Sequence, residues 1–528
     1  MSLEGLLKRK IVGGSGAITN KIGRVDALQS IKSRDDFKIC FDVEQLIDNV
    51  LPSANQTYDN NTPFLITRLR YDGGFLYLFL TGANNVQFYY RAPCTIYSYK
   101  RCFHNSTPCP YKCKPYKSMV VTGLKERECH RVNVYKVDRE KCKEDDAFIL
   151  DEFCTNENRV QMQLGIYEGD YVCFENGVRV NEHGCVVGML SSLKKINVKD
   201  IQTPIDVIAG CFDLETYTNL QSFSNAKIDP IITISYVLQT HNAIKRYCFI
   251  NTQRNHFDLD DPVECDAEYV DGEVFVVPCH NERDMIVSFL KLLFRSNPDD
   301  ILDYNGDKFD IPYLLQRAEI LNIDKKCVQR YDLPPQEMNT VLVNTKFGYS
   351  FNNYFMKYFN HVDLYQYVKG SFDCSKMENL KLDTVASYYL KVGKVELSVR
   401  EMMNLYNSGK FAKIVKYNVR DSVLPLQMFR KCKIANKLYA DASLLYLTRD
   451  DSTLTIWRKI NLALFNRALN NTTASNESDE YFFNKYDLTK IMHRKKHNSD
   501  TNKTNINNND DDDTDCEDGE DEEEEEND

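Results

Sequence analysis

The chain has 528 residues, too many for one ordinary hydrophobic core, and 42% of them are hydrophobic, so we expect two or three folded domains. Its net charge of −11 is concentrated near the C-terminus, where residues 498–528 hold 16 of the 77 Asp and Glu but one of the 66 Lys and Arg. Residues 1–497 therefore carry 61 acidic and 65 basic side chains, a balance that permits nucleic-acid binding without indicating it. The sequence contains no apolar run long enough to span a membrane and no secretion signal, so its 18 Cys are expected to be reduced thiols.

Residues 1–203 are rich in aromatic side chains, turn residues and Cys. The apolar runs 75–80 and 86–90 lie between Gly and Asn residues, which predicts two strands. We therefore expect a β-rich N-terminal domain. Four residues in it have side chains that bind zinc, but no second matching Cys pair follows, so free buried thiols are favoured over a zinc site. These residues are Cys102, His104, Cys109 and Cys113.

Residues 204–432 show strand and helix patterns in succession. Apolar runs predict strands at 207–215, 229–238, 246–251, 273–278 and 300–304. Apolar residues at helical spacing predict an amphipathic helix over 282–295, and Pro312 is placed to begin a second helix over 313–321. This order of elements predicts an α/β domain with a mixed sheet.

Residues 433–492 have a helical and then an irregular pattern, which we interpret as a linker. Residues 493–528 are first basic, then rich in Asn, and then almost purely acidic. Such a composition buries too little apolar surface to form a core, so we expect a disordered tail and interpret it as an insert between domains.

The first candidate site residues are Asp213 and Glu215, at the end of the strand predicted over 207–215. Side chains alternate along a strand, so these two carboxylates point to the same side and repel each other. A divalent cation such as Mg²⁺ or Mn²⁺ removes that repulsion, because it prefers oxygen ligands. On this segment alone, solvated acids at an exposed strand end remain the favoured interpretation.

A second candidate, Asp310, lies where a predicted strand passes into a helix, with Asn305 five residues before it. Alone, this acid is better interpreted as an N-cap ahead of Pro312.

The third candidate segment is a predicted helix over 411–428, which continues past Pro425. Tyr417 and Asp421 are four residues apart and share one face of it. A phenol beside a carboxylate can hold a water in place, although a pair of residues on a helix surface is the simpler alternative.

Together, these three segments resemble the exonuclease motifs of family B DNA polymerases, D-x-E, N-x-x-x-F-D and Y-x-x-x-D, in order and in spacing. Residues 361–365 (HVDLY) and 380–386 (LKLDTVA) resemble segments that the family has between its second and third motifs. The resemblance covers about residues 205–430 and is closest to polymerases of large insect DNA viruses of the baculovirus kind. It implies a ribonuclease-H-like exonuclease domain.

The resemblance also implies the chemistry of the site. Two divalent metals, Mg²⁺ or Mn²⁺, are held by four acids, which here are Asp213, Glu215, Asp310 and Asp421. The Tyr417 hydroxyl is implied to orient the attacking water, with Glu215 near it. Asn305 and Phe309 are implied to contact the last nucleotide of a frayed 3′ end, although Phe309 fits equally well as a core anchor for the helix that follows.

The palm motifs of the family, D-x-x-S-L-Y-P-S and Y-G-D-T-D, are absent from the sequence. The pair Asp513 and Asp515 lies inside the acidic tail, and we reject it as a catalytic pair. We therefore expect the N-terminal portion of a viral DNA polymerase, either a fragment or a separately encoded half, with the 3′→5′ proofreading exonuclease. Its expected partners are single-stranded 3′ ends and primer–template DNA, with a processivity factor as a further candidate, and its expected location is the host nucleus.

Two other functions stay open. One is a non-catalytic nucleic-acid-binding scaffold. The other is a stand-alone exonuclease of the DEDD type, which has four catalytic acids. The presence of all four acids favours an enzyme over a scaffold. The long N-terminal region and the Y-x-x-x-D form of the third motif favour the polymerase over the stand-alone nuclease.

Overall fold

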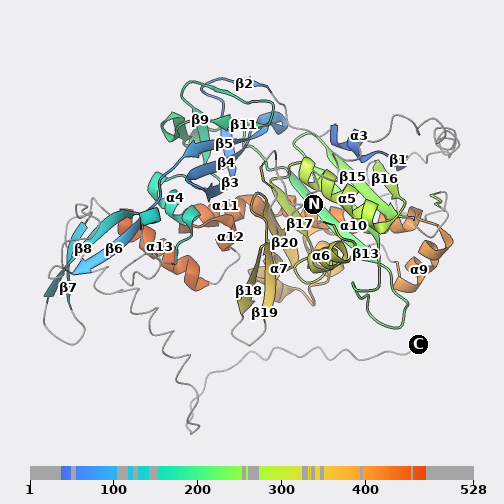
Figure 1. Cartoon of the computed structure of the whole chain (residues 1–528). Helices are drawn as coiled ribbons and strands as arrows, with labels where there is room; N and C mark the ends of the chain where they lie inside the picture. The colour runs from blue at the N-terminus through green and yellow to red at the C-terminus, as the bar shows by residue number, and fades with distance from the viewer. Residues whose placement is uncertain are drawn as a thin grey trace, which may run out of the picture.

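The computed structural model describes residues 37–470 except for 49–54, 104–116, 123–128, 142–150, 152, 253–256, 260–272, 324–330, 332, 335–338, 345–349, 393–396 and 453–455. Figure 1 shows two main β-sheets, one built from N-terminal strands and one from the middle of the chain. The acidic tail, the basic segment 493–497 and three of the four possible zinc ligands (His104, Cys109 and Cys113) lie outside the described residues.

The sheet that carries the candidate site has seven strands in the order β1-β16-β15-β14-β13-β17-β20. Their bounds are β1 Phe37–Ile39, β16 Val274–Cys279, β15 Ile244–Asn251, β14 Ile231–Gln239, β13 Ala209–Thr216, β17 Asp300–Asp303 and β20 Asn360–Asp363. β14 runs antiparallel to both of its neighbours, while the remaining pairs are parallel. The expected mixed sheet is therefore confirmed, and its first strand comes from far upstream in the chain.

Helices cover both faces of this sheet. α5 (Glu282–Arg295) and α6 (Asp310–Ile320) share one hydrophobic core with Phe212 and Leu214 of β13. α10 (Ala412–Lys431) shares a second core with Ala209 and Cys211 of the same strand. Since β13 alternates, its odd-numbered residues face α10 and its even-numbered residues face α5.

α5 shows how closely a local pattern can define an element. The Asn281 side chain caps the helix by accepting the Asp284 N–H at 2.8 Å, and the helix ends at Arg295, the residues predicted from spacing alone. Its Phe289 is fully buried against Phe212, with ring centroids 5.5 Å apart. The buried face of α5 therefore supports β13 from behind.

The N-terminal part is β-rich, as expected. A six-stranded sheet contains β11 (Cys185–Val187), β5 (Gln87–Pro93), β4 (Phe75–Thr81), β3 (Phe64–Asp72), β9 (Tyr171–Phe174) and β12 (Leu193–Ile196) in that order. A three-stranded sheet contains β6 (Tyr97–Phe103), β8 (Cys129–Asp138) and β7 (Lys117–Thr122), and β10 (Val178–Arg179) pairs with β2 (Thr57–Tyr58). The predicted strands at 75–80 and 86–90 correspond to β4 and β5.

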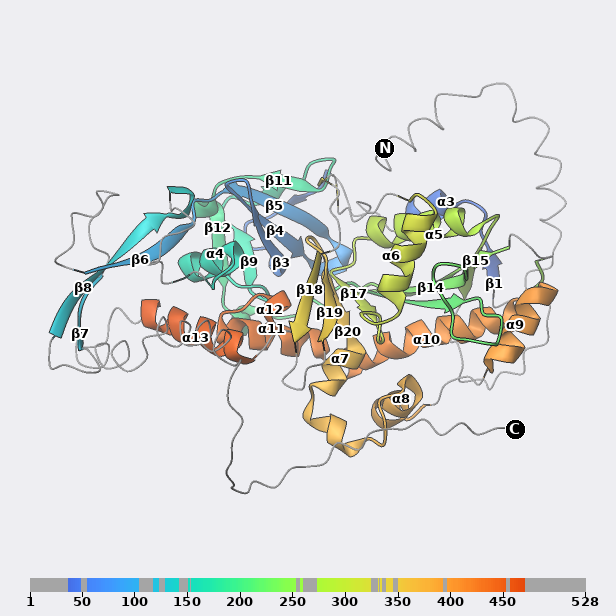
Figure 2. The ribbon, with the colours of Figure 1, turned by 60° about the horizontal axis from the view of Figure 1, so that its bottom comes forward.

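The C-terminal helices connect the two parts of the molecule. Figure 2 shows α10, α11 (Ile434–Leu445) and α13 (Ile456–Asn470) in one row that reaches from the seven-stranded sheet towards β6. The Phe465 ring of α13 lies 6.1 Å from the Tyr99 ring of β6. α12 (Arg449–Ser452) lies between α11 and α13 in the chain.

A buried arginine joins the N-terminal sheet to the rest. Arg68 of β3 has a fully buried side chain, which donates to Asp450 of α12 and to Asn360 of β20, both at 2.7 Å. It also donates to the backbone carbonyl of Met356 at 2.6 Å. One side chain thus connects three segments that are far apart in the sequence.

The remaining elements surround the seven-stranded sheet or cap the N-terminal one. The α-helices are α3 (Val43–Asp48), α4 (Asn156–Leu164), α7 (Leu364–Lys369), α8 (Leu382–Leu390) and α9 (Val399–Ser408), and β18 (Asn339–Asn344) pairs with β19 (Ser350–Phe355). The described residues also contain five 3-10 helices: Ala83–Asn85, Arg139–Lys141, Leu190–Ser192, Val198–Asp200 and Phe372–Lys376.

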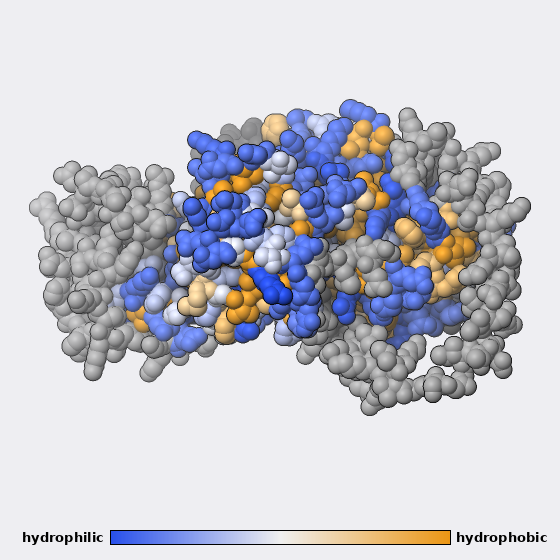
Figure 3. Space-filling model, turned by 90° about the horizontal axis from the view of Figure 1, so that it is seen from above, coloured by the Kyte–Doolittle hydropathy of each residue, from blue (hydrophilic) through white to orange (hydrophobic). Residues whose placement is uncertain are grey.

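Figure 3 shows one face of the described part of the molecule, coloured by hydropathy. Seen from above in Figure 3, this face is mostly hydrophilic, and hydrophobic residues occur on it in several separate areas. Within the described residues, no helix combines the length and the apolar character that crossing a membrane requires.

Candidate functional site

The central residues of the site are Asp213 and Glu215, at the end of β13. Their even-numbered neighbours Phe212 and Leu214 are buried towards α5, so the two carboxylates lie on the face covered by α10. Both acids are half-buried. The expectation that they point to the same side is borne out by this alternation.

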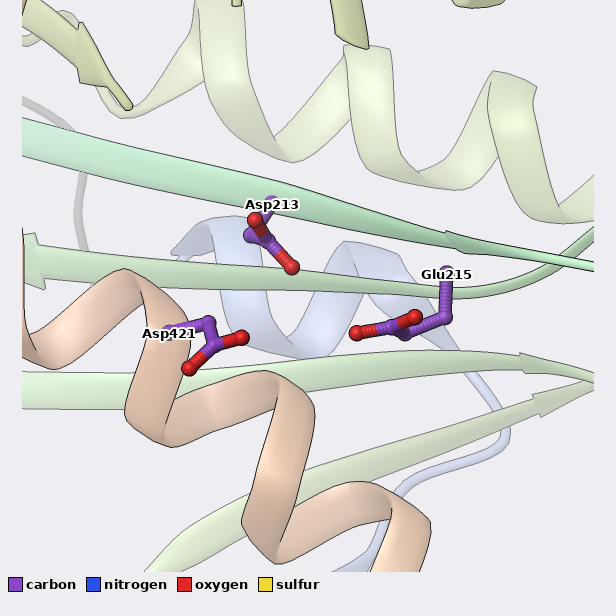
Figure 4. A group of neighbouring side chains, drawn as sticks. All are labelled: Asp213, Glu215 and Asp421. Atoms are coloured by element: carbon purple, nitrogen blue, oxygen red, sulfur yellow. The ribbon is translucent and has the colours of Figure 1, made fainter. Parts of the chain in front are cut away.

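α10 brings a third carboxylate to the same place. Asp421 is 5% exposed, and one carboxylate oxygen from each of Asp213, Glu215 and Asp421 lies within 4.8 Å of the other two. Figure 4 shows the three side chains pointing towards one another, two from β13 and one from α10. Two of the three predicted segments therefore converge, although about 200 residues separate them in the chain.

Asn418 holds Asp213 in this arrangement. Its side-chain nitrogen Nδ2 donates to Asp213 Oδ2 at 2.8 Å. The backbone carbonyl of Asn418 accepts a hydrogen bond from the Ser235 hydroxyl of β14 at 2.8 Å, and Ser235 also lies 2.6 Å from the Ser422 hydroxyl. The sequence reasoning missed Asn418, whose only signal was its place one helical turn before Asp421.

Replacing Asn418 by alanine is expected to weaken Mn²⁺ binding by roughly tenfold to a hundredfold, because partners that orient a metal ligand contribute about this much. The measurement is an EPR titration of the purified chain with Mn²⁺. Asn404→Ala, at an exposed position on α9, is the matched control and should bind Mn²⁺ as the unmodified chain does. Unchanged affinity in Asn418→Ala would show that Asn418 does not support the ligand.

Asp310 borders this group without being one of its three members. It is the first residue of α6, is 4% exposed, and its Oδ1 accepts the backbone N–H of Leu214 at 3.2 Å. Burial, and then the charge of Asp303, hold the pKa of Asp310 well above its usual range. The position before it, Phe309, is the N-cap, so the interpretation of Asp310 as an N-cap is wrong.

A cleft of about 390 Å³ opens beside the carboxylates. It is lined by Asp213, Tyr304, Asn305, Tyr365, Leu380, Lys381, Leu382 and Asp421. Its volume lies in the range of small-molecule sites, and it combines apolar and aromatic walls with a few polar groups. Tyr365 and Lys381 were not identified from the sequence as site residues, although both lie in the segments 361–365 and 380–386.

Asn305 and Phe309 have different positions around the cleft. Asn305 lines it in the left-handed backbone conformation, with φ 65°, and its Oδ1 is buried with no hydrogen-bond partner among the described residues. Phe309 is 41% exposed, and its nearest ring partner is Tyr313 at 5.4 Å. That exposure does not fit a core anchor for α6.

Tyr417 lies one turn before Asp421 on α10, as predicted. It is half-buried and packs against the hydrophobic core on the α10 face of the sheet. In the part of the chain that the structure describes, it is not among the residues that line the cleft.

The three convergent carboxylates fit a hard divalent cation. Three negative charges within 4.8 Å, one of them on a buried side chain, repel one another strongly at low dielectric. Carboxylate oxygens are the ligands that Mg²⁺ and Mn²⁺ prefer. Asp310 accepts the backbone N–H of Leu214, between Asp213 and Glu215, and is not one of the three residues whose oxygens converge.

Comparison with known proteins gives consistent matches. Residues 183–385 match the family described as DNA polymerase family B, exonuclease domain, a stretch that contains all the predicted site residues except Tyr417 and Asp421. The chain is 34% identical over 450 residues to the DNA polymerase of Autographa californica nuclear polyhedrosis virus, covering 81% of this chain and 45% of that protein. The corresponding protein of Bombyx mori nuclear polyhedrosis virus is 35% identical over 450 residues, covering 81% and 44%.

A more distant relative shares a shorter region. The DNA polymerase delta catalytic subunit of Candida albicans is 25% identical over 225 residues, which cover 42% of this chain and 20% of that protein. The chain spans less than half the length of the two viral relatives.

Proposed function

Residues 183–385 belong to the exonuclease domain of DNA polymerase family B, and from this membership we propose that the chain removes nucleotides from 3′ ends of DNA by metal-dependent hydrolysis. The observation that carries the proposal is the group of Asp213, Glu215 and Asp421 at one side of a cleft of nucleotide size. A ribonuclease-H-like arrangement of the domain is part of the proposal, and the mixed sheet with helices on both faces supports it.

In this proposal the four acids hold two divalent ions, Mg²⁺ or Mn²⁺, with Asp310 as the fourth ligand residue. Bound there, such ions lower the pKa of water and stabilise the charge that develops on the leaving oxygen. Hydrogen bonds within the chain orient the carboxylates: Asn418 orients Asp213, and the backbone N–H of Leu214 orients Asp310. Tyr417, one turn before Asp421, orients the attacking water together with Glu215.

The cleft holds the last nucleotide of an unpaired strand. Asn305 lines the cleft with an amide side chain, and Tyr304 and Tyr365 offer aromatic surface. Lys381 supplies a positive charge for a phosphate. Phe309, 41% exposed at the start of α6, is available to stack on a base. In the reaction, water adds to the terminal phosphodiester, the bond from phosphorus to the 3′ oxygen breaks, and a deoxynucleoside monophosphate leaves.

We further propose that this activity proofreads replication as part of a viral DNA polymerase that works in the host nucleus on primer–template DNA, with a processivity factor as a candidate partner. The similarity to polymerases of nuclear polyhedrosis viruses supports this setting. A mismatched primer end unpairs at lower cost than a matched one, so it reaches a single-strand cleft more often. The polymerising step lies outside the proposal because the palm motifs are absent from these residues.

The test is digestion of a single-stranded oligonucleotide labelled at its 5′ end, in Mg²⁺ or Mn²⁺, with products separated by length. We expect shortening by single nucleotides from the 3′ end, none in EDTA, and faster removal of a mismatched than of a matched primer end. An RNA oligonucleotide of the same sequence tests the stand-alone nuclease alternative. Tight binding of DNA without shortening in either metal would favour the non-catalytic scaffold and overturn the proposal.

A further inference from the structure

A cluster of buried ionisable side chains surrounds the loop 304–309, which joins β17 to α6, and includes one residue of the loop itself. Three of its members are carboxylates with little or no exposure, namely Asp303 (0%), Asp307 (7%) and Asp363 (6%). The fourth is His361 of β20, whose side chain is 4% exposed. The metal-binding group described above uses none of these four residues.

The carboxylates of the cluster bind the backbone of the loop. Asp363 accepts the Asn305 N–H at 2.8 Å and the Asp307 N–H at 3.4 Å, and Asp303 accepts the Gly306 N–H at 3.2 Å. Three successive backbone N–H groups thus donate hydrogen bonds to two buried carboxylates. This arrangement holds Asn305 in its left-handed conformation.

Gly306 lies so close to the cluster that a side chain does not fit. A Cβ atom there would be 2.2 Å from Cγ of Asp303, a buried side chain that has no room to move away. The loop is therefore pressed onto Asp303, and its shape follows that of the cluster beneath it.

His361 links the acids to the rest of the sheet. Its Nε2 lies 2.7 Å from Asp303 Oδ2, and its Nδ1 lies 2.9 Å from the backbone carbonyl of Tyr354. The Tyr354 carbonyl can only accept, so Nδ1 donates to it, and in an imidazolium ring Nε2 also donates, to Asp303. Burial disfavours this cation, but attraction to Asp303 outweighs burial and raises the pKa of His361 to about 10. Asp307, with Oδ1 3.9 Å from Nδ1, and Asp363 also face it.

We propose that His361, Asp303 and Asp363 form a positioning cluster for the exonuclease, in which the imidazolium offsets the buried acids and so fixes the loop that directs Asn305 into the cleft. The inference rests on the proposed function. Asn305 is the connection to the substrate, because it lines the cleft while its backbone N–H is held by Asp363 of the cluster. His361 itself does not line the cleft, so it acts through Asn305.

Replacing His361 by glutamine removes the charge and leaves one amide where two ring nitrogens donate. The loop then loses its fixed shape, so we expect KM for single-stranded DNA to rise roughly tenfold or more, since small misplacements of binding groups cost up to about a hundredfold. His183→Gln, at a side chain 57% exposed, is the matched control and should leave KM unchanged.

The effect of His361→Gln on KM, measured with and without Asn305→Ala, distinguishes a positioning role of His361 from a merely structural one. If His361 acts through Asn305, then His361→Gln should change KM by less than twofold in an Asn305→Ala background. Loss of folded protein alone lowers the apparent kcat in every background and leaves KM as it was. Asp363→Asn, which retains one acceptor oxygen, is the milder second variant and should raise KM in the same direction.

The possible outcomes distinguish the inference from the proposed function. An unmodified chain that does not shorten DNA refutes the proposed function, and the inference with it. An active unmodified chain whose KM is unchanged in His361→Gln and in Asp363→Asn overturns the inference alone. Fold-changes in KM that multiply in the double variant of His361 and Asn305 also overturn it.

Discussion

Replacing Asp213 by alanine is expected to lower the rate of single-strand digestion by roughly a thousandfold or more, with the fold intact. Removing one group that stabilises developing charge costs about 10²–10³ in rate, and Asp213 is also the ligand residue that Asn418 orients. Asp213 is half-buried at a strand end and is not part of either hydrophobic core, so its loss leaves the packing of β13 unchanged. The measurement is the initial rate of 3′ shortening at saturating Mg²⁺.

Two further substitutions sharpen this test. Asp421→Ala removes the carboxylate that α10 contributes and should cost about as much activity as Asp213→Ala, since the two act on the same ions. Asp200→Ala, an exposed acid outside the site, should retain the rate of the unmodified chain. Digestion at the unmodified rate by Asp213→Ala would refute the assignment of the site.

Replacing Arg68 by alanine is expected to lower the free energy of the first unfolding transition by about 2–6 kcal/mol, because two buried acceptors lose their donor at about 1–3 kcal/mol each. The side chain is fully buried and donates to Asp450 and Asn360, both at 2.7 Å. Its removal leaves the buried Asn360 oxygen and the carbonyl of Met356 without this donor. Urea unfolding followed by circular dichroism measures the change.

The matched control for Arg68 is an ion pair at the surface. Lys357 donates to Asp72 at 2.8 Å, and the side chain of Asp72 is 59% exposed. Lys357→Ala should change stability by less than about 1 kcal/mol, since exposed pairs contribute little. Equal effects of Arg68→Ala and Lys357→Ala would show that the buried arginine does not hold the N-terminal sheet to β20 and α12.

Much of the fold of residues 204–432 could be predicted from local sequence patterns. α5 was predicted with its observed bounds because its apolar spacing is a local signal. β13 and β14 were predicted within a few residues, since each is an apolar run of strand length. The alternation within β13 also predicted that Asp213 and Glu215 share a side.

Other features leave no local signal. β1 is three residues long, and it joins the sheet only through pairing with β16, more than 230 residues away. Arg68 is an arginine in a strand, a residue type that is almost never fully buried unless it is paired, and its partners come from distant segments. Long-range pairing of this kind cannot be derived from the residues on either side.

Only part of the site could be predicted, because its supporting contacts also join residues that are far apart in the chain. The motifs identified the four acids but gave all four the same role as metal ligands. In the structure, the oxygens of Asp213, Glu215 and Asp421 lie within 4.8 Å of one another. Asp310 instead contacts the backbone N–H of Leu214. Asn418 and His361 act by hydrogen bonds to residues far away in the chain. Such supporting contacts become visible only when the strands and helices are assembled.

The most direct test of the account is the location of Mn²⁺ in crystals of the chain, by anomalous scattering. We expect an anomalous peak within coordination distance of Asp213, Glu215 and Asp421, and none at this place in crystals of Asp213→Ala. A saturating Mn²⁺ soak that leaves the space between these three carboxylates without a peak would contradict the account.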